Sequence, residues 1–161
     1  LADPGPIHEM VEAVVKARYV LFLGRGYSYP VALEGALKLK EIAYIPCEAY
    51  PAGEMKHGPI AMLEEGTPVI FIAPRDSHRD KAISNMKEVQ ARGARLFCIH
   101  TAGDTEIAEL ADVSIPVPDT ADLCTPLLTV LPLQLLAYHA GVAMGRDIDK
   151  PRNLAKSVTV E

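Results

Sequence analysis

The alternation of short apolar runs with helix-like segments is the feature of this sequence that most constrains its fold. The runs are almost continuously apolar and rich in Val, Ile, Leu and Phe, and a weaker run lies near residues 47–50. Continuous rather than alternating hydrophobicity is typical of strands that are buried on both faces of a parallel sheet. The main runs occupy residues 19–23, 68–73, 95–100 and 113–117.

Segments with helical spacing separate these runs. In residues 77–92 the apolar positions recur at helical intervals, and Gly93 fits a C-cap. Strands that alternate with helices pair in parallel through right-handed crossovers. We therefore predict an α/β fold, a three-layer α-β-α sandwich around about five parallel strands. The other helical segments are expected at residues 6–16, 30–43, 104–110 and 124–144.

Length and composition narrow the class of protein. The 161 residues fit one domain with a sizeable core. Sixteen Lys and Arg residues against 21 Asp and Glu residues give a net charge of −5, so we expect no nucleic-acid partner. The longest apolar segment, 125–144, is interrupted by proline and polar residues, so we expect no membrane span and a cytoplasmic protein. Cys47, Cys98 and Cys124 are too scattered for a disulfide framework or a zinc site, and we expect them to be buried.

The loops after the strands are the first places to look for a ligand site. Ligands of open α/β sheets bind beyond the carboxyl ends of the strands, which here means the loops 24–30, 51–59 and 73–80. Two glycines follow the first strand, but Tyr29 occupies the third glycine position of a dinucleotide-binding fingerprint, which disfavours a nucleotide-binding domain. The loop 73–80 contains arginines but lacks a glycine and a hydroxyl-rich cradle. We therefore expect no complete phosphate site in this chain.

A few polar side chains are candidates for chemistry. Glu34, Lys38 and Glu41 have the spacing of one helix face, which usually means a solvated ion-pair stripe and alternatively a carboxylate base beside an ammonium group. His57 falls in a loop, where an imidazole is either an acid–base group or a surface residue without a role. Lys156 lies in a polar C-terminal segment. A lysine there is ordinarily solvated, although one with a lowered pKa can form an imine with a carbonyl compound.

These candidates belong to motifs that resemble the sugar isomerase (SIS) domain family. The motifs are GRG at 24–26, YPVALEGALKLKEI at 29–42, EAY at 48–50 and GEMKHGP at 53–59. PLQLLAYH at 132–139 and the ending PRNLAKSVTVE at 151–161 are similar to the second, C-terminal SIS domain of glucosamine-6-phosphate synthases, the isomerising glutamine–fructose-6-phosphate aminotransferases. The resemblance extends over nearly the whole chain and implies the flavodoxin-like SIS fold.

The resemblance implies roles for the residues of the helix and the loop. Glu41 corresponds to the carboxylate that moves a proton between C1 and C2 of the open-chain sugar. Lys38 corresponds to a lysine near the reacting centre, and Glu34 to a neighbouring acid that holds this lysine. His57 corresponds to a histidine that helps to open the sugar ring and that comes from the partner subunit. The resemblance therefore also implies a homodimer.

The C-terminal segment carries two further residues of this kind. Lys156 corresponds to the lysine that forms an imine with fructose 6-phosphate and directs ammonia to C2. Ala155 corresponds to a residue that touches the sugar through its backbone. The resemblance implies neither a metal nor an organic cofactor, and the sequence has no cluster with metal-ligand spacing.

The resemblance also organises the chain. It implies an SIS domain over residues 1–146, with a linker at 1–6, and a catalytic tail over 147–161. The glutaminase domain and the first SIS domain of that family, which holds the sugar phosphate, have no counterpart in this sequence. We therefore expect a partial chain of an enzyme that forms glucosamine 6-phosphate, inactive alone, whose partners are the sugar phosphates and the rest of the enzyme. The alternative is a stand-alone SIS module that binds a sugar phosphate for regulation.

Overall fold

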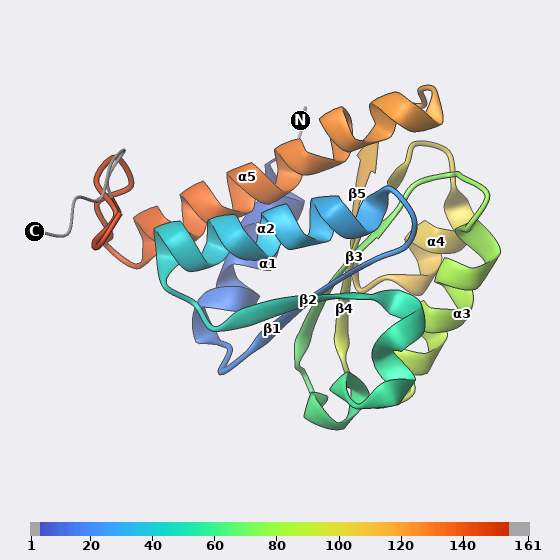
Figure 1. Ribbon diagram of the computed structural model, residues 1–161, viewed down its shortest axis with the longest axis horizontal. Coiled ribbons are helices and arrows are strands. Elements are labelled where there is room, and N and C mark those ends of the chain that lie inside the picture. The colour runs from blue at the N-terminus through green and yellow to red at the C-terminus, as the bar shows by residue number, and fades with distance from the viewer. Residues whose placement is uncertain (1–3, 155–161) are drawn as a thin grey trace, which may run out of the picture.

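A five-stranded parallel sheet forms the centre of the chain, and the computed structural model describes residues 4–154 (Figure 1). The strand order is β2-β1-β3-β4-β5, and every neighbouring pair is parallel. The strands are β1 (Val20–Gly24), β2 (Cys47–Pro51), β3 (Pro68–Ala73), β4 (Arg95–Thr101) and β5 (Val113–Val117). The predicted parallel strands are confirmed, including the weaker one.

Two layers of helices cover the sheet, which confirms the predicted three-layer sandwich (Figure 1). On one face lie α1 (Gly5–Lys16), α2 (Ser28–Ala43) and α5 (Thr125–Ala143). On the other face lie α3 (Arg79–Gln90) and α4 (Thr105–Leu110). Short 3-10 helices lie in the connecting loops, namely η1 (Ala52–His57), η2 (Pro59–Met62) and η3 (Asp122–Cys124).

The central strand β3 shows why continuous apolar runs form the strands of this sheet. All of its residues are buried, because helices cover both faces. Its side chains alternate between two cores. Ile70 and Ile72 enter the core under α1, α2 and α5, whereas Val69 and Phe71 enter the core under α3 and α4. Full burial of one such side chain contributes about 1.5–3 kcal/mol, so the two cores stabilise the sheet on which the helices rest.

The helices α2 and α5 lie side by side across one face of the sheet (Figure 1). Gly35 of α2 faces Leu133 of α5, and a Cβ atom added at Gly35 would lie only 2.7 Å from Leu133 Cδ1. The missing side chain therefore lets the two helices approach closely. This contact fixes the position of α2, the helix that carries three of the predicted site residues.

The apolar helix predicted over residues 124–144 is confirmed, but it meets a length and hydropathy criterion for a membrane span that the sequence was not expected to meet. Residues Asp122–Ala143 form a helical segment of 22 residues with a mean hydropathy of 1.4, which is long and apolar enough to cross a membrane. Pro132 lies inside α5 without ending it, in agreement with the continuous helix predicted over residues 124–144. The same helix packs against α1 and α2, and core helices of soluble proteins share this length and composition.

Two of the three cysteines lie where they were predicted. Cys47 and Cys98 are buried, and burial raises the pKa of the Cys47 thiol to about 11. Cys124 is exposed, so the prediction is wrong for this residue. The physical reason is its place at the end of η3, ahead of α5 and outside both cores.

Candidate active site

Three of the predicted site residues lie together on the outer face of α2. Lys38 Nζ is 2.6 Å from Glu41 Oε2 and 3.7 Å from Glu34 Oε1. The side chains of Glu34, Lys38 and Glu41 are 40, 31 and 27% exposed, so a molecule outside the helix can reach them. Residues three and four positions apart share a helix face, so the local spacing explains why the structure brings these three together.

The ammonium group of Lys38 is held by both carboxylates. The hydrogen bond to Glu41 is the main reason that the pKa of Lys38 lies above its ordinary value, and the charge of Glu34 adds to the effect. Within residues 4–154, Lys38 engages Oε2 of Glu41, and Oε1 of that carboxylate accepts no hydrogen bond. The face therefore offers an accessible carboxylate oxygen beside a fixed positive charge, which is an arrangement suited to proton transfer.

This face does not lie in the loops to which the sheet rule pointed. α2 begins after the carboxyl end of β1 and runs back across the sheet, so Glu41 lies in its last turn, ahead of β2. Leu39 and Ala43 turn toward the core and leave the charged face outward. The helical spacing located these residues, whereas the position of the strand ends did not.

His57 lies at the other end of β2 from Glu41. It is the last residue of η1, which directly follows the carboxyl end of β2, and its side chain is 75% exposed. Its Nε2 is 3.9 Å from Oε2 of Glu54. The strand between them is five residues and roughly 15 Å long. A single chain therefore does not bring Glu41 and His57 together.

The described part of the chain ends beside the end of α2. Tyr44 directly follows α2, and its hydroxyl accepts a hydrogen bond of 2.8 Å from the backbone N–H of Arg152. The guanidinium carbon of Arg152 lies 4.3 Å from the centre of the Tyr44 ring. The predicted site residues Ala155 and Lys156 lie outside the described residues. The segment that precedes them is thus held next to the helix that carries Glu41.

Comparison with known families and proteins gives this fold and site a context. The SIS domain family matches residues 13–144. This chain belongs to the SIS domain family. It is 54% identical over 153 residues to the glutamine–fructose-6-phosphate aminotransferase (isomerizing) of Bacteroides thetaiotaomicron, covering 95% of this chain and 25% of that protein. It is 55% identical over 155 residues to the protein of the same name from Chlorobaculum tepidum, covering 96% and 25%. The chain thus spans about a quarter of the length of these curated relatives.

Two solved structures are similar to this SIS domain. The C-terminal domain of glucosamine-fructose-6-phosphate aminotransferase from Francisella tularensis superposes with a TM-score of 0.85 at 39% identity, over 91% of this chain and 41% of that chain. A putative tagatose-6-phosphate ketose/aldose isomerase from Clostridium novyi superposes with a TM-score of 0.79 at 20% identity, over 96% of this chain and 44% of that chain. The second likeness concerns the fold alone.

At the carboxyl edge of this SIS domain, carboxylates engage the arginines of the loop 73–80. Arg79 donates hydrogen bonds of 2.6 and 2.7 Å to Asp104 and one of 2.9 Å to Glu106. The hydrogen bonds from Arg79 lower the pKa of Asp104. Arg75 Nη1 lies 3.8 Å from Asp119 Oδ2. Both arginines of this loop are therefore already partnered by acidic side chains.

A chain of polar contacts that sequence reasoning missed ties η1 of the SIS domain to α3. Lys56 Nζ lies 2.8 Å from Glu88 Oε1, and Glu88 Oε2 accepts a hydrogen bond of 3.2 Å from Asn85. Asn85 Oδ1 in turn accepts a hydrogen bond of 2.8 Å from Arg25. A Cβ atom at Gly53 would lie 2.8 Å from Arg25 Nη1, so a larger residue there would make the guanidinium shift. These contacts hold the short helix that ends in the predicted histidine.

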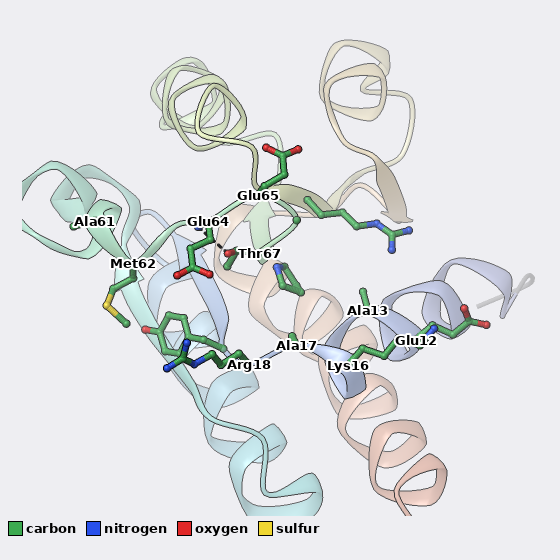
Figure 2. A pocket seen from close by; sticks show the side chains of 14 residues that line it. Glu12, Ala13, Lys16, Ala17, Arg18, Ala61, Met62, Glu64, Glu65 and Thr67 are labelled. Carbon is green, nitrogen blue, oxygen red and sulfur yellow. Dashed lines mark hydrogen bonds between the residues drawn. The ribbon is translucent and has the colours of Figure 1, made fainter.

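Two recesses of this SIS domain lie away from the predicted site residues. One, of about 700 Å³, opens at the amino edge of the sheet among charged side chains (Figure 2). Another, of about 970 Å³, is mostly apolar and lies between α1, β5 and α5. Glu34, Lys38, Glu41 and His57 line neither. In the described part of the chain, no group of three or more His, Cys, Asp or Glu side chains could hold a metal ion. The charged face of α2 therefore belongs to neither of these recesses.

Proposed function

We propose that this SIS domain is the C-terminal isomerase domain of a glutamine–fructose-6-phosphate aminotransferase. Such an enzyme would convert fructose 6-phosphate and ammonia taken from glutamine into glucosamine 6-phosphate. The observation that carries the proposal is the identity of 54% over 95% of this chain to the Bacteroides thetaiotaomicron protein of that name. The accessible pair of Glu41 and Lys38 supports it, because an isomerisation between ketose and aldose needs a base at the reacting carbons.

Glu41 is the proposed base. Its carboxylate would remove a proton from C1 of the open-chain sugar imine and return a proton to C2, which turns the ketose skeleton into the aldose. One carboxylate can serve both carbons because they are adjacent. Lys38 would stabilise the negative charge that develops as the proton leaves C1, since the two glutamates keep its ammonium group charged and fixed.

Lys156 and Ala155 complete the proposed chemistry. The amine of Lys156 would attack C2 of fructose 6-phosphate and release water to form an imine. Ammonia would then displace the lysine, which leaves the sugar imine on which Glu41 acts. Ala155 would bind the sugar through its backbone. The contact of Tyr44 with Arg152 supports this proposal, because it holds the described end of the chain near the helix of Glu41.

A homodimer forms part of the proposal. His57 would assist opening of the sugar ring in the site of the partner subunit rather than in its own. The placement of Glu41 and His57 at opposite ends of β2 supports this, because one chain cannot use both at one sugar. The dimer would thus contain two sites, each built from two chains.

The rest of the enzyme would supply what this chain lacks. In the proposal, residues 1–146 are the SIS domain and residues 147–161 the catalytic tail, while other parts of a cytoplasmic enzyme bind the sugar phosphate and release ammonia. The engagement of Arg79 by Asp104 and Glu106 supports this, because an arginine held by two acids is a poor anion site. This chain alone would therefore be inactive, since the binding energy of the phosphate is needed to position the reacting carbons.

The test is the variant Glu41→Gln in the full-length protein that contains this chain. Formation of glucosamine 6-phosphate from fructose 6-phosphate and glutamine should fall by about 100-fold to 10,000-fold, because an amide cannot accept the proton. Glu109→Gln on the exposed side of α4 is the matched control and should retain normal activity. Near-normal activity of Glu41→Gln would overturn the base assignment. A native protein that forms no product and only binds sugar phosphate would favour the regulatory alternative.

A further inference from the structure

Local hydrogen bonds shape the segment that directly follows α5. The backbone N–H of Arg146 donates a hydrogen bond of 2.9 Å to the carbonyl of Gly141. The carboxylate of Asp147 accepts hydrogen bonds of 3.1 Å from the backbone N–H groups of Asp149 and Lys150. These bonds turn the chain sharply after α5. The turn returns the segment toward the end of α2, the helix that α5 accompanies across the sheet.

Tyr44, which directly follows α2, contacts this segment. Its hydroxyl accepts the backbone N–H of Arg152, a contact between residues 108 positions apart. The guanidinium carbons of Arg146 and Arg152 lie 5.2 and 4.3 Å from the centre of its ring. An aromatic ring attracts a cation placed over its face. One side chain thus makes contacts with both ends of the turn that follows α5.

The left-handed backbone conformation of Tyr44 indicates that its side chain does more than end α2. Tyr44 is the C-cap of α2 and has φ 60° and ψ 28°, the left-handed conformation in which glycine or asparagine is favoured. A bulky side chain is strained in this conformation. Only one other non-glycine residue among positions 4–154 has positive φ, and that is Asn153, which adjoins Arg152. Strain of this kind persists where the surrounding contacts require it, and it concentrates at functional sites.

We propose that Tyr44 is a positioning residue that fixes where the C-terminal segment leaves the fold, next to the end of α2 that carries Glu41, and that it thereby controls imine formation at Lys156. The inference rests on the proposed function, since it takes Lys156 as the imine-forming residue. The distances are compatible. Tyr44 lies three residues beyond Glu41, which is about 5 Å along a helix axis. Lys156 lies four residues beyond Arg152, a reach of at most roughly 14 Å of extended chain.

Two substitutions separate the contacts of Tyr44 from its role in the helix end. Tyr44→Asn removes the ring and the hydroxyl but keeps a residue that tolerates the left-handed conformation, so α2 can still end there. Tyr44→Phe keeps the ring and removes only the hydroxyl that accepts the Arg152 N–H. Tyr19→Phe is the matched control, because it also removes a phenol hydroxyl and its hydrogen bond, in this case to Glu48.

The experiment uses the full-length protein and two readouts. The first is hydrogen–deuterium exchange of backbone amides in residues 146–154, with a thermal scan to confirm the fold. The second is the rate at which borohydride traps an imine between fructose 6-phosphate and Lys156, located by mass spectrometry. In Tyr44→Asn we expect faster exchange at Arg152 and trapping slowed by roughly tenfold to a hundredfold. We expect a smaller change of both in Tyr44→Phe and none in Tyr19→Phe.

Each other outcome overturns a defined part of the inference. Faster exchange in Tyr44→Asn with trapping as in the native protein would mean that the contact holds the segment but does not position the lysine. Unchanged exchange would mean that Tyr44 does not hold the segment at all. If the native protein itself yields no adduct at Lys156, the proposed role of that lysine fails, and the exchange data alone still decide whether Tyr44 anchors the segment.

Discussion

Among single residues, Lys38 has the arrangement that is hardest to explain by stability alone. Ion pairs between residues three or four positions apart on a helix contribute only about 0.2–0.5 kcal/mol each. Lys38 makes two of these pairs, with Glu34 and Glu41, on a partly exposed face of α2. A small gain in stability does not require that one lysine be shared by two acids. A fixed positive charge beside an accessible carboxylate is, in contrast, directly useful to the proposed proton transfer.

This argument predicts different effects of Lys38→Met on stability and on activity. The free energy of unfolding of the chain should change by less than about 1 kcal/mol, because the lost pairs are partly exposed. Formation of glucosamine 6-phosphate by the full-length protein should fall by about tenfold or more, mainly through kcat. Lys40→Met, in the same helix but on an exposed position outside the Glu34 and Glu41 contacts, serves as the control. Equal activity of the two variants would remove Lys38 from the proposed site.

The residues that could be predicted from the sequence are those whose neighbours are local. Glu34, Lys38 and Glu41 share a face because helical spacing alone brings them together. The contact between Tyr44 and Arg152 joins positions 108 residues apart, and it depends on how α2 and α5 pack. A tyrosine at a left-handed helix end also contradicts the usual preference for glycine, so no local signal marks it.

Among the elements, the strands could be predicted well because their burial dictates their composition. β3 reads as an unbroken apolar run and is buried throughout. The 3-10 helices η1 and η2 were expected only as a loop, since their backbone is held by the contacts of Met55 and by the polar chain from Arg25 to Lys56 rather than by a repeating pattern. The link between α3 and α4 likewise depends on tertiary contacts, among them the ion pair of Arg79 with Asp104.

From the ion pair of Arg79 with Asp104 we predict that Asp104→Asn changes the free energy of unfolding by an amount that depends on pH. Asp104 has a side chain only 3% exposed and accepts two hydrogen bonds from Arg79, which lower its pKa. A lowered pKa means that the pair stabilises the fold above the ordinary aspartate range and that this contribution is lost as pH falls through the lowered value. At pH 7, Asp104→Asn should therefore lower the free energy of unfolding of this chain by about 1–3 kcal/mol. The asparagine can still accept the N–H of Ile107 at the start of α4.

Urea unfolding of the native chain and the variant between pH 7 and pH 3 provides the measurement. The difference in the free energy of unfolding between the native chain and Asp104→Asn should narrow as the carboxylate of Asp104 takes up its proton. Asp80→Asn changes another acid near Arg79, 3.5 Å away and 97% exposed, and should leave the stability unchanged. A difference for Asp104→Asn that stays constant over this range would show that the loss comes from packing and not from charge.

For the whole molecule, several features of the site agree with the proposal that other chains or domains complete it. The charged face of α2 belongs to neither of the two recesses described above. Glu41 and His57 lie at opposite ends of β2, and the arginines of the loop 73–80 are partnered by acids. The chain spans about a quarter of its curated relatives. If one site requires residues from two subunits, mixtures of variant subunits should reveal it.

The prediction concerns heterodimers of two inactive variants of the full-length protein, Glu41→Gln and His57→Ala. If each proposed site takes its glutamate from one subunit and its histidine from the partner, a heterodimer contains one site with both residues intact and one with neither. Purified through two different affinity tags, it should recover about half the activity of the native dimer. If both residues acted within one subunit, every site would lack one of them and mixing would restore nothing. Heterodimers that carry both changes on one subunit provide the reverse control. They should lose activity at both sites in the shared arrangement, and at only one site if the two residues act within a single subunit.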